Sequence, residues 1–340
     1  MPGFRVRKHK SGNVYYYFDT GTKGVKEIPL GSDYREAVKK WIELSNAPTV
    51  HPCETFADLA DKYEAEVVTT KAKSTQATQR GDIRKLREFF CNPSPAPLNE
   101  IKPKHVYLLL QWAKSTPTTA NRLKRTLSHM FNMARAWGWT ENENPCTGIE
   151  GHSLGKREVY ITDEVFKAVY EQGSDLLKDA MDLAYLTGQR PGDVRELTER
   201  NIKDGYLVIK QSKTGAPLRF VIEGALAELL DRIARRKAGS KIYSLNLLTS
   251  PRGTAVPPVT LRRHFEAARE KAATASEKAG NAQMAADIRA FWFYDLRAKA
   301  ADDVADERGE QAAAKQLGHT SVSTTKRHYL RRGAKVSATK

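Results

Sequence analysis

The chain has 340 residues, and its 56 Lys and Arg against 40 Asp and Glu give a formal net charge of +16. This length allows two or three domains with hydrophobic cores, and the excess positive charge favours a polyanionic partner, above all nucleic acid. The apolar stretches are too short to span a membrane and the N-terminus lacks a signal peptide, so we expect a cytoplasmic protein without a membrane partner.

Motifs for metal ions and for nucleotide cofactors are missing from the sequence. Cys53, Cys91 and Cys146 lie far apart without a CxxC pair, which argues against a zinc site. Neither common glycine-rich phosphate-binding motif occurs, so nucleotide hydrolysis and dinucleotide chemistry are not indicated. We therefore expect no metal and no cofactor.

Residues 1–50 predict a small β-domain. Short runs of Phe, Val and Tyr alternate with turn signals, which predicts a three-stranded meander. A helix should follow at "DYREAVKKWIEL", with Asp33 as its N-cap. The strands are basic, which favours a nucleic-acid-binding module over a solubilising β-extension. Its candidate DNA contacts are Arg5, Arg7, Lys8 and Lys10.

Residues 54–145 predict a helical domain. Apolar residues recur at helical spacing in "TFADLADKYEAEVV" and "TQRGDIRKLREFF", and again in "HVYLLLQWAK" and "TANRLKRTLSHMFNMARAWGW". The last of these helices has three basic side chains available to solvent, which either contact DNA or are simply hydrated: Arg122, Lys124 and Arg125.

A polar, turn-rich linker precedes a larger mixed domain over residues 153–340. Helices are expected over "DEVFKAVYEQ" and "LLKDAMDLAYLT", the second ending at Gly188, and later over "TLRRHFEAAREKAA", "FYDLRAKAADDVAD" and "EQAAAKQLG". One β-hairpin, "GYLVIKQSKTGAPLRFVI", interrupts them. The predicted fold class is mainly α with small β elements (α+β).

Five polar residues of this domain form a set that could attack a phosphodiester without a metal. Each alone has an ordinary explanation, as a helix cap (Arg190), a turn lysine (Lys213), a buried paired cation (Arg297), a loop histidine (His319) or a packing residue (Tyr329). Together, two guanidinium groups can bind the phosphate oxygens, and a lysine can protonate a leaving oxygen. A phenol, whose pKa is about 10, becomes a nucleophile when cations lower that pKa. We therefore expect an exposed tyrosine that awaits an anion.

The motifs that carry these residues resemble those of a known family. The segments "TGQRPGDVREL", "SKTG", "FYDLRAKAA" and "LGHTSVSTT", followed by a tyrosine, are similar in order and spacing to those of tyrosine site-specific recombinases of the phage integrase branch. The resemblance covers essentially the whole chain. It implies an arm-binding β-domain (1–50), a helical core-binding domain (54–145) and a catalytic recombinase domain (153–340).

The resemblance also implies roles for the five residues. Arg190 and Arg297 would clamp the scissile phosphate, and Lys213 would act as the general acid. His319 would hydrogen-bond the phosphate. Tyr329 would form a 3′-phosphotyrosyl link and free a 5′-hydroxyl, so that religation needs no ATP.

Two positions depart from the family pattern. Tyr294 stands where the family usually has a histidine, and a phenol, although it can hydrogen-bond a phosphate, is a far poorer general base than imidazole. Tyr329 lies ten residues after His319, where nine is commoner, and the ninth position holds His328. We retain Tyr329 as the nucleophile because no other tyrosine follows the "LGH" segment.

The expected function is site-specific recombination that integrates and excises a mobile element. The resemblance implies double-stranded DNA with core and arm-type attachment sites, a homotetramer on paired sites, and a host bending protein and an excisionase as accessory partners. Two alternatives remain open. One is a DNA-binding protein of the same fold with weakened catalysis, which Tyr294 supports, and the other is a type IB-like topoisomerase.

Overall fold

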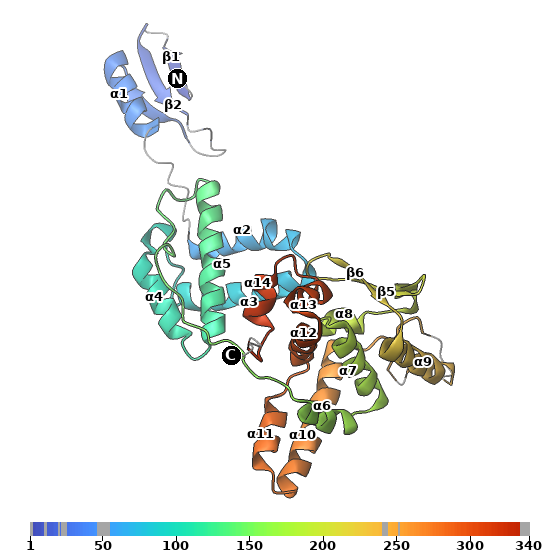
Figure 1. Ribbon diagram of the computed structural model, residues 1–340. Coiled ribbons are helices and arrows are strands. Elements are labelled where there is room, and N and C mark those ends of the chain that lie inside the picture. Colours follow the sequence, from blue (N-terminus) through green and yellow to red (C-terminus); the bar gives the residue numbers. More distant parts are fainter. Residues whose placement is uncertain are drawn as a thin grey trace, which may run out of the picture. The chain divides into compact units, whose positions relative to one another are not determined.

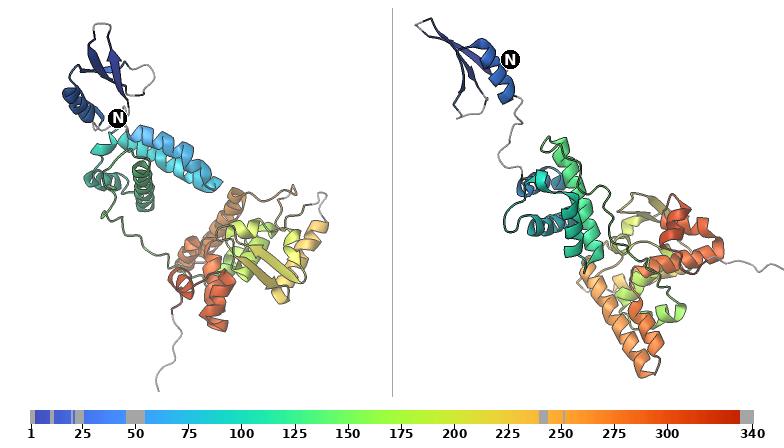
Figure 2. Two further views of the ribbon diagram at one scale, coloured as in Figure 1. Left: turned by 90° about the horizontal axis from the view of Figure 1, so that it is seen from above. Right: turned by 90° about the vertical axis from the view of Figure 1, so that its left-hand side faces the viewer.

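The computed structural model describes residues 3–9, 12–19, 21, 26–45, 55–239, 244–250 and 252–333. The chain divides into two compact units, Met1–Gly155 and Lys156–Lys340. The described residues are mostly helical, with one three-stranded sheet near the N-terminus and another in the second unit (Figures 1 and 2), so the predicted fold class is confirmed. Among the described helices, none combines the length and the hydrophobicity that crossing a bilayer requires.

The N-terminal sheet is the predicted meander. Its elements are β1 (Phe4–Lys8), β2 (Val14–Phe18), β3 (Ile28–Gly31) and the following helix α1 (Tyr34–Ser45). The strands pair antiparallel in the order β1-β2-β3, with Phe4 opposite Phe18. Asp33 accepts a hydrogen bond from the backbone N–H of Glu36 at 2.9 Å, so its predicted capping of α1 is confirmed. The Phe4 ring lies 5.4 Å from the ring of Tyr16, which helps to pin the sheet.

The basic residues of this sheet form exposed ion pairs. Arg5 pairs with Asp19 and Arg7 with Glu27, each at 2.8 Å, while both arginine side chains remain about three-fifths exposed. Such pairs in water are weak and exchange readily for another anion. Lys8 is exposed and Lys10 lies outside the described residues. Contact of these residues with DNA stays a prediction.

The rest of the first unit is a helical bundle, as expected. Its elements are α2 (Phe56–Glu66), the 3₁₀ turn η1 (Val68–Thr70), α3 (Lys73–Phe90), η2 (Leu98–Glu100), α4 (Pro103–Trp112) and α5 (Pro117–Ala136). A capping box between Thr55 and Asp58 begins α2, and prolines begin α4 and α5, where a missing N–H costs nothing. The apolar faces of α2, α3, α4 and α5 form a single core.

One of the three basic residues on α5 is an internal partner of the bundle. The Nε of Arg122 donates to both carboxylate oxygens of Asp82 at 2.9 Å, and Asp82, on α3, is only 1% exposed. Thr126 also donates to this carboxylate. Lys124 is half-buried and Arg125 is exposed. Arg122 therefore compensates a buried charge, whatever its relation to DNA.

Removal of this partner should destabilise the bundle. We expect Arg122→Ala to lower the free energy of unfolding by about 1–3 kcal/mol, because the buried carboxylate of Asp82 loses its charged donor. The matched change Arg125→Ala removes an exposed arginine one helical turn away and should alter stability by less than about 0.5 kcal/mol. Urea unfolding followed by circular dichroism measures both. Equal losses in the two variants would contradict the structural role of Arg122.

The second unit contains most of the helices. Its elements are α6 (Asp163–Glu171), α7 (Asp175–Thr187), α8 (Pro191–Arg195), η3 (Glu199–Asn201), β4 (Ile202–Lys203), β5 (Tyr206–Lys210), β6 (Pro217–Val221), α9 (Gly224–Ala238), α10 (Pro258–Lys278), α11 (Ala282–Ala290), α12 (Asp295–Arg308), α13 (Glu310–Leu317) and α14 (Val322–His328). The predicted hairpin is β5–β6, to which β4 adds a short third strand. Helices α9, α11 and α14 were not expected from the sequence.

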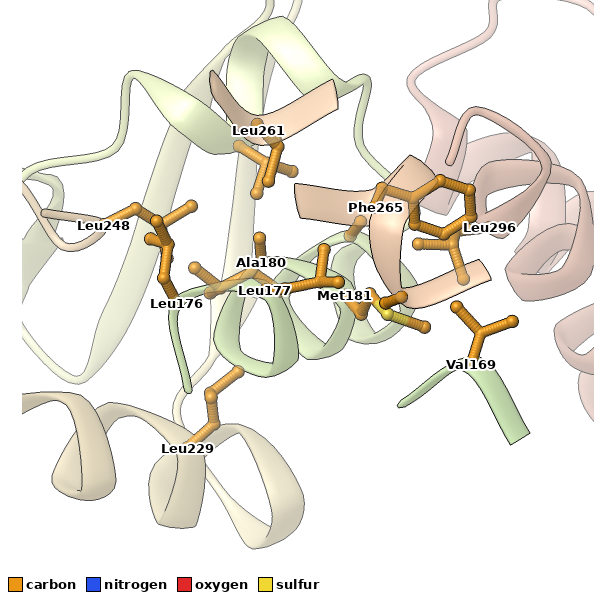
Figure 3. Packing of buried hydrophobic residues seen from close by; sticks show 14 of the residues in the cluster. Val169, Leu176, Leu177, Ala180, Met181, Leu229, Leu248, Leu261, Phe265 and Leu296 are labelled. Atoms are coloured by element: carbon orange, nitrogen blue, oxygen red, sulfur yellow. The ribbon is translucent and has the colours of Figure 1, made fainter. Parts of the chain in front are cut away.

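Helix α7 lies at the centre of this unit. Figure 3 shows Leu177, Ala180 and Met181 of α7 among apolar side chains of neighbouring helices, including Leu229 of α9 and Phe265 of α10. All of these side chains are buried, so the helices pack around one contiguous core. This core fixes the position of the C-terminal end of α7, next to which the candidate site lies.

Candidate active site

Arg297 is the centre of the candidate site. It projects from α12, is 1% exposed, and donates from Nη1 to the carbonyl of Gly188 at 2.7 Å and from Nη2 to that of Leu317 at 2.8 Å. These carbonyls lie at the ends of α7 and α13, where helical partners are lacking and the helix dipoles favour a cation. Both helices end in left-handed glycines, Gly188 (φ 65°) and Gly318 (φ 68°). The sequence predicted a partner for this cation, and the partners are carbonyls rather than a carboxylate.

The guanidinium of Arg297 keeps unused donor capacity. Its Nη2 lies 3.1 Å from Nε2 of His319, and its carbon lies 5.1 Å from the centre of the Tyr329 ring. Its Nε is buried and has no hydrogen-bond partner in the described part of the chain. Because a buried N–H without a partner is costly, this donor fits an acceptor that arrives with a ligand.

His319 is held as a neutral imidazole. Its Nδ1 lies 2.8 Å from the hydroxyl of Thr325, which is completely buried. Since an arginine only donates, Nε2 must be the accepting nitrogen and Nδ1 must carry the proton that goes to Thr325. Partial burial, with the charges of Arg297, Arg190 and His328, lowers the pKa of His319 to about 4.

Tyr329 is buried rather than exposed, so that expectation was wrong. It is 7% exposed and follows directly on α14, which packs against α13. Its ring packs with Ala298, Ala301 and Ala313 in a small cluster of buried side chains. Ala298 and Ala301 lie on α12 and Ala313 lies on α13, and together these small side chains leave room for one aromatic ring. Because other helices form this pocket, the spacing of residues along α14 does not predict the burial of Tyr329.

The hydroxyl groups of Tyr329 and Tyr294 lie 2.8 Å apart. Burial alone would raise the pKa of Tyr329, but the hydrogen bond with Tyr294 and the charges of Arg297 and Arg190 outweigh it, and the pKa lies below its ordinary value. Partial burial, with the same hydrogen bond, raises the pKa of Tyr294. Either hydroxyl can donate while both are protonated, and once Tyr329 loses its proton only Tyr294 can donate.

Arg190 is contributed to the site by the segment between α7 and α8. It immediately precedes α8, its side chain is 17% exposed, and its Nη1 lies 3.3 Å from Oε1 of Gln211 and 3.9 Å from Oδ2 of Asp193. These are long contacts, so the guanidinium keeps donors for a further acceptor. Lys213 lies in the β5–β6 turn and is exposed; among the described residues it makes no hydrogen bond or ion pair with the other candidates.

Sequence reasoning missed Gln211, which is buried at the end of β5. Its Oε1 accepts from the hydroxyl of Thr214 at 2.7 Å, which ties the turn that carries Lys213 to Arg190. The available signal was a polar residue directly before the "SKTG" segment, at the end of an apolar strand. Because the sequence does not show the hydrogen-bond partners of Gln211, this residue could not be distinguished from a polar residue that simply ends a strand.

The segment after Tyr329 is anchored within the same molecule. The backbone N–H of Arg331 donates to Asp302 at 2.9 Å, and its Nη1 donates to Asp295 at 2.9 Å. Asp295 is fully buried at the start of α12 and also pairs with Arg157. The tyrosine is thus fixed on both sides against the helix that carries Arg297. Within the described residues, no three His, Cys, Asp or Glu side chains cluster as a metal site would require.

The family model for the phage integrase family matches residues 161–335, which is just over half of the chain and includes all six candidate catalytic residues. The chain belongs to the phage integrase family. The family prediction is thereby confirmed, and this integrase is a tyrosine recombinase, an enzyme of site-specific recombination.

Similar proteins cover nearly the whole integrase. The integrase of Escherichia phage HK022 is 29% identical over 348 residues, and that of Escherichia phage lambda is 27% identical over 346; each alignment covers 94% of this chain and 92% of the relative. The crystal structure of a lambda integrase tetramer bound to a Holliday junction is similar with a TM-score of 0.69 and 23% identity, over 100% of this chain and 98% of that chain. This second likeness supports the fold.

The electrostatics of the site predict the titration of His319. Burial and positive neighbours disfavour its protonated form, so it should titrate at about pH 4 instead of near 6.5 and stay neutral at physiological pH. Histidine-selective NMR of the free protein measures this, with the resonance assigned by its loss in His319→Gln. A midpoint near 6.5 for His319 would contradict the described geometry.

Proposed function

We propose that this integrase cleaves and rejoins DNA strands through a covalent bond between Tyr329 and a 3′ phosphate. One observation carries the proposal: the hydroxyls of Tyr329 and Tyr294 lie 2.8 Å apart while the guanidinium of Arg297 lies over the Tyr329 ring. A phenol in this setting has a lowered pKa, and its oxygen is a better nucleophile than that of a free tyrosine.

Two arginines and His319 would bind the scissile phosphate. Arg190 makes only long contacts and Arg297 has a free Nε, so each can donate to a non-bridging oxygen. In the free protein His319 is neutral, and its Nε2 faces Arg297. A bound phosphate would bring the negative charge that offsets the arginines, and His319 could then take up a proton and donate to the phosphate.

The proposed cleavage step balances without a metal. The Tyr329 oxygen bonds to phosphorus as its proton passes to solvent water, and the bond between phosphorus and the 5′ oxygen breaks. Lys213 donates a proton to that leaving oxygen, which forms a 5′-hydroxyl. The arginines stabilise the charge that grows on the phosphoryl oxygens. Attack by a 5′-hydroxyl of another strand reverses the step and releases Tyr329.

We further infer how the integrase assembles. The similar lambda structures are a tetramer bound to a Holliday junction and a dimer bound to a COC′ core site. By analogy, a homotetramer would act on paired sites in double-stranded DNA, with residues 1–50 on arm-type sites, 54–145 on core sites and 153–340 in catalysis. A host bending protein and an excisionase would set direction. The proposed DNA substrate implies a cytoplasmic site of action.

Because Tyr294 replaces a stronger base, the alternative is a DNA-binding protein of the same fold with weakened catalysis. The hydrogen bond to Tyr329 argues against this alternative, because Tyr294 can donate to the Tyr329 oxygen once that oxygen has lost its proton. A supercoiled plasmid with a single core site also tests for a topoisomerase. Relaxation without any paired site would favour that activity over recombination.

Loss of the nucleophilic oxygen should abolish the covalent intermediate. We expect Tyr329→Phe to bind core-site DNA with near wild-type affinity but to form no protein–DNA adduct, because the ring is retained and the attacking atom is not. A denaturing gel with end-labelled DNA measures the adduct, and a native gel measures binding. An adduct that persists in the variant would place the nucleophile elsewhere.

Loss of either arginine that is proposed to bind the scissile phosphate should slow cleavage. Arg190→Ala should reduce the single-turnover rate by ~100-fold or more, as removal of a transition-state donor commonly does. Arg297→Lys should cause a similar loss, because an ammonium lacks the planar geometry that reaches two carbonyls and a phosphate. Arg308→Ala is a matched control, since it removes an exposed arginine at the far end of α12. Rates within a few-fold of wild type for Arg190→Ala would refute its role.

A further inference from the structure

Gln211 is a completely hydrogen-bonded buried amide. Its Nε2 donates to Oε1 of Gln189 at 2.6 Å and to the carbonyl of Leu317 at 2.8 Å. Its Oε1 accepts from the hydroxyl of Thr214 at 2.7 Å and from Nη1 of Arg190 at 3.3 Å. An amide offers two donor hydrogens and two acceptor positions, so every one of its hydrogen-bonding positions is in use.

These four bonds lead to three different parts of the active site. Arg190 is one of the two phosphate arginines, and Thr214 adjoins Lys213 in the β5–β6 turn. Leu317 offers the carbonyl that also accepts from Arg297. Gln211 is therefore the point at which α8, the hairpin turn and the end of α13 meet.

The backbone around Gln211 is fitted closely to its side chain. A Cβ on Gly318 would lie 2.9 Å from Nε2 of Gln211, and Gly318 already has a left-handed φ of 68°. Gln189, beside Arg190, extends the network to the carbonyl of Gln316 at 2.8 Å. Because the amides of both Gln211 and Gln189 are fully hydrogen-bonded, this part of the network is rigid and resists displacement of the groups bound to it.

We propose that Gln211 is a positioning residue that holds Arg190, the Lys213 turn and the carbonyl bound by Arg297 in one catalytic arrangement. The inference rests on the proposed function, since it concerns how those groups are placed on a phosphate. It adds a residue that itself touches no reacting atom. Displacement of catalytic groups by about 1 Å can cost ~100-fold in rate, so such a residue matters for cleavage more than for DNA binding.

The network has two arms, one from Gln211 through Thr214 to the Lys213 turn and one from Gln211 to Arg190, and substitutions can separate them. Thr214→Val removes the hydroxyl that joins the Lys213 turn to Gln211 and leaves the contact with Arg190 in place. Gln211→Glu has nearly the same shape, but it sets a carboxylate oxygen against Oε1 of Gln189 and the carbonyl of Leu317, and it pairs tightly with Arg190. The first variant should affect the general acid, and the second should affect both arms.

The experiment compares two suicide DNA duplexes that carry a core site, one with the natural 5′-bridging oxygen and one with sulfur at that atom. A thiol has a much lower pKa than an alcohol, so sulfur leaves without a proton from Lys213. We expect Thr214→Val to lose about tenfold or more in cleavage rate on oxygen and to regain most of it on sulfur, as Lys213→Ala should. Thr214→Ser, which retains the donor, should recover most of the loss on oxygen.

Gln211→Glu should lose ~100-fold on oxygen and stay defective on sulfur, because Arg190 is drawn away from the phosphate. Its thermal unfolding and DNA binding are measured alongside, and if it fails to fold the Thr214 pair decides the question. Wild-type cleavage by Thr214→Val, or an equal loss on both substrates, would overturn the proposal. A folded Gln211→Glu with wild-type rates would do the same.

The outcomes also distinguish a failure of the proposed role of Gln211 from a failure of the proposed function. If the wild-type protein forms no adduct on either duplex, or Tyr329→Phe still forms one, the proposed function fails. If the wild type forms the adduct and the network variants cleave normally, only the role of Gln211 fails.

Discussion

The charge of Arg297 is the constraint on which the active site depends. A guanidinium that is 1% exposed is stable only where the protein replaces its water, and here two helix ends do so through the carbonyls of Gly188 and Leu317. Because a left-handed glycine ends each helix, the carbonyls at both ends are free to accept. The solvation of one cation thus brings the ends of α7 and α13 to the face of α12, and the other candidate residues emerge beside that point.

The same cations act in opposite directions on their two aromatic neighbours. Together with burial they oppose a proton on His319, which stays neutral, and together with the hydrogen bond to Tyr294 they favour loss of a proton from Tyr329, whose pKa is lowered. In the free protein Arg190 makes only a long contact with the carboxylate of Asp193, and Arg297 has a buried N–H that lacks a partner in the described residues. A phosphodiester supplies both the charge and the acceptor, so binding needs little rearrangement of the donors.

Local patterns in the sequence predicted the elements, while contacts between distant segments had to be observed. The meander, the Asp33 cap and the end of α7 at Gly188 follow from turn residues, capping side chains and glycine, whose effects reach only a few positions. The order of short motifs was enough to identify the family. The burial of Tyr329 was missed because alanines from α12 and α13 create its pocket. Gln211 was missed because three of its four partners, Gln189, Arg190 and Leu317, lie far from it in the sequence.

Tyr294 shows how a departure from the family pattern can be compatible with the chemistry. A histidine at this position would offer a base, whereas the phenol has a raised pKa and is a poor one, so it cannot take the proton of Tyr329 near neutral pH. Its hydroxyl instead donates to the oxygen that becomes negative as the proton leaves. A donor stabilises the phenolate both when it attacks phosphorus and when it departs during religation, since the two steps are the reverse of one another. With tyrosine at position 294, deprotonation of Tyr329 therefore depends on the hydrogen bond and the cations that lower its pKa, and not on a neighbouring base.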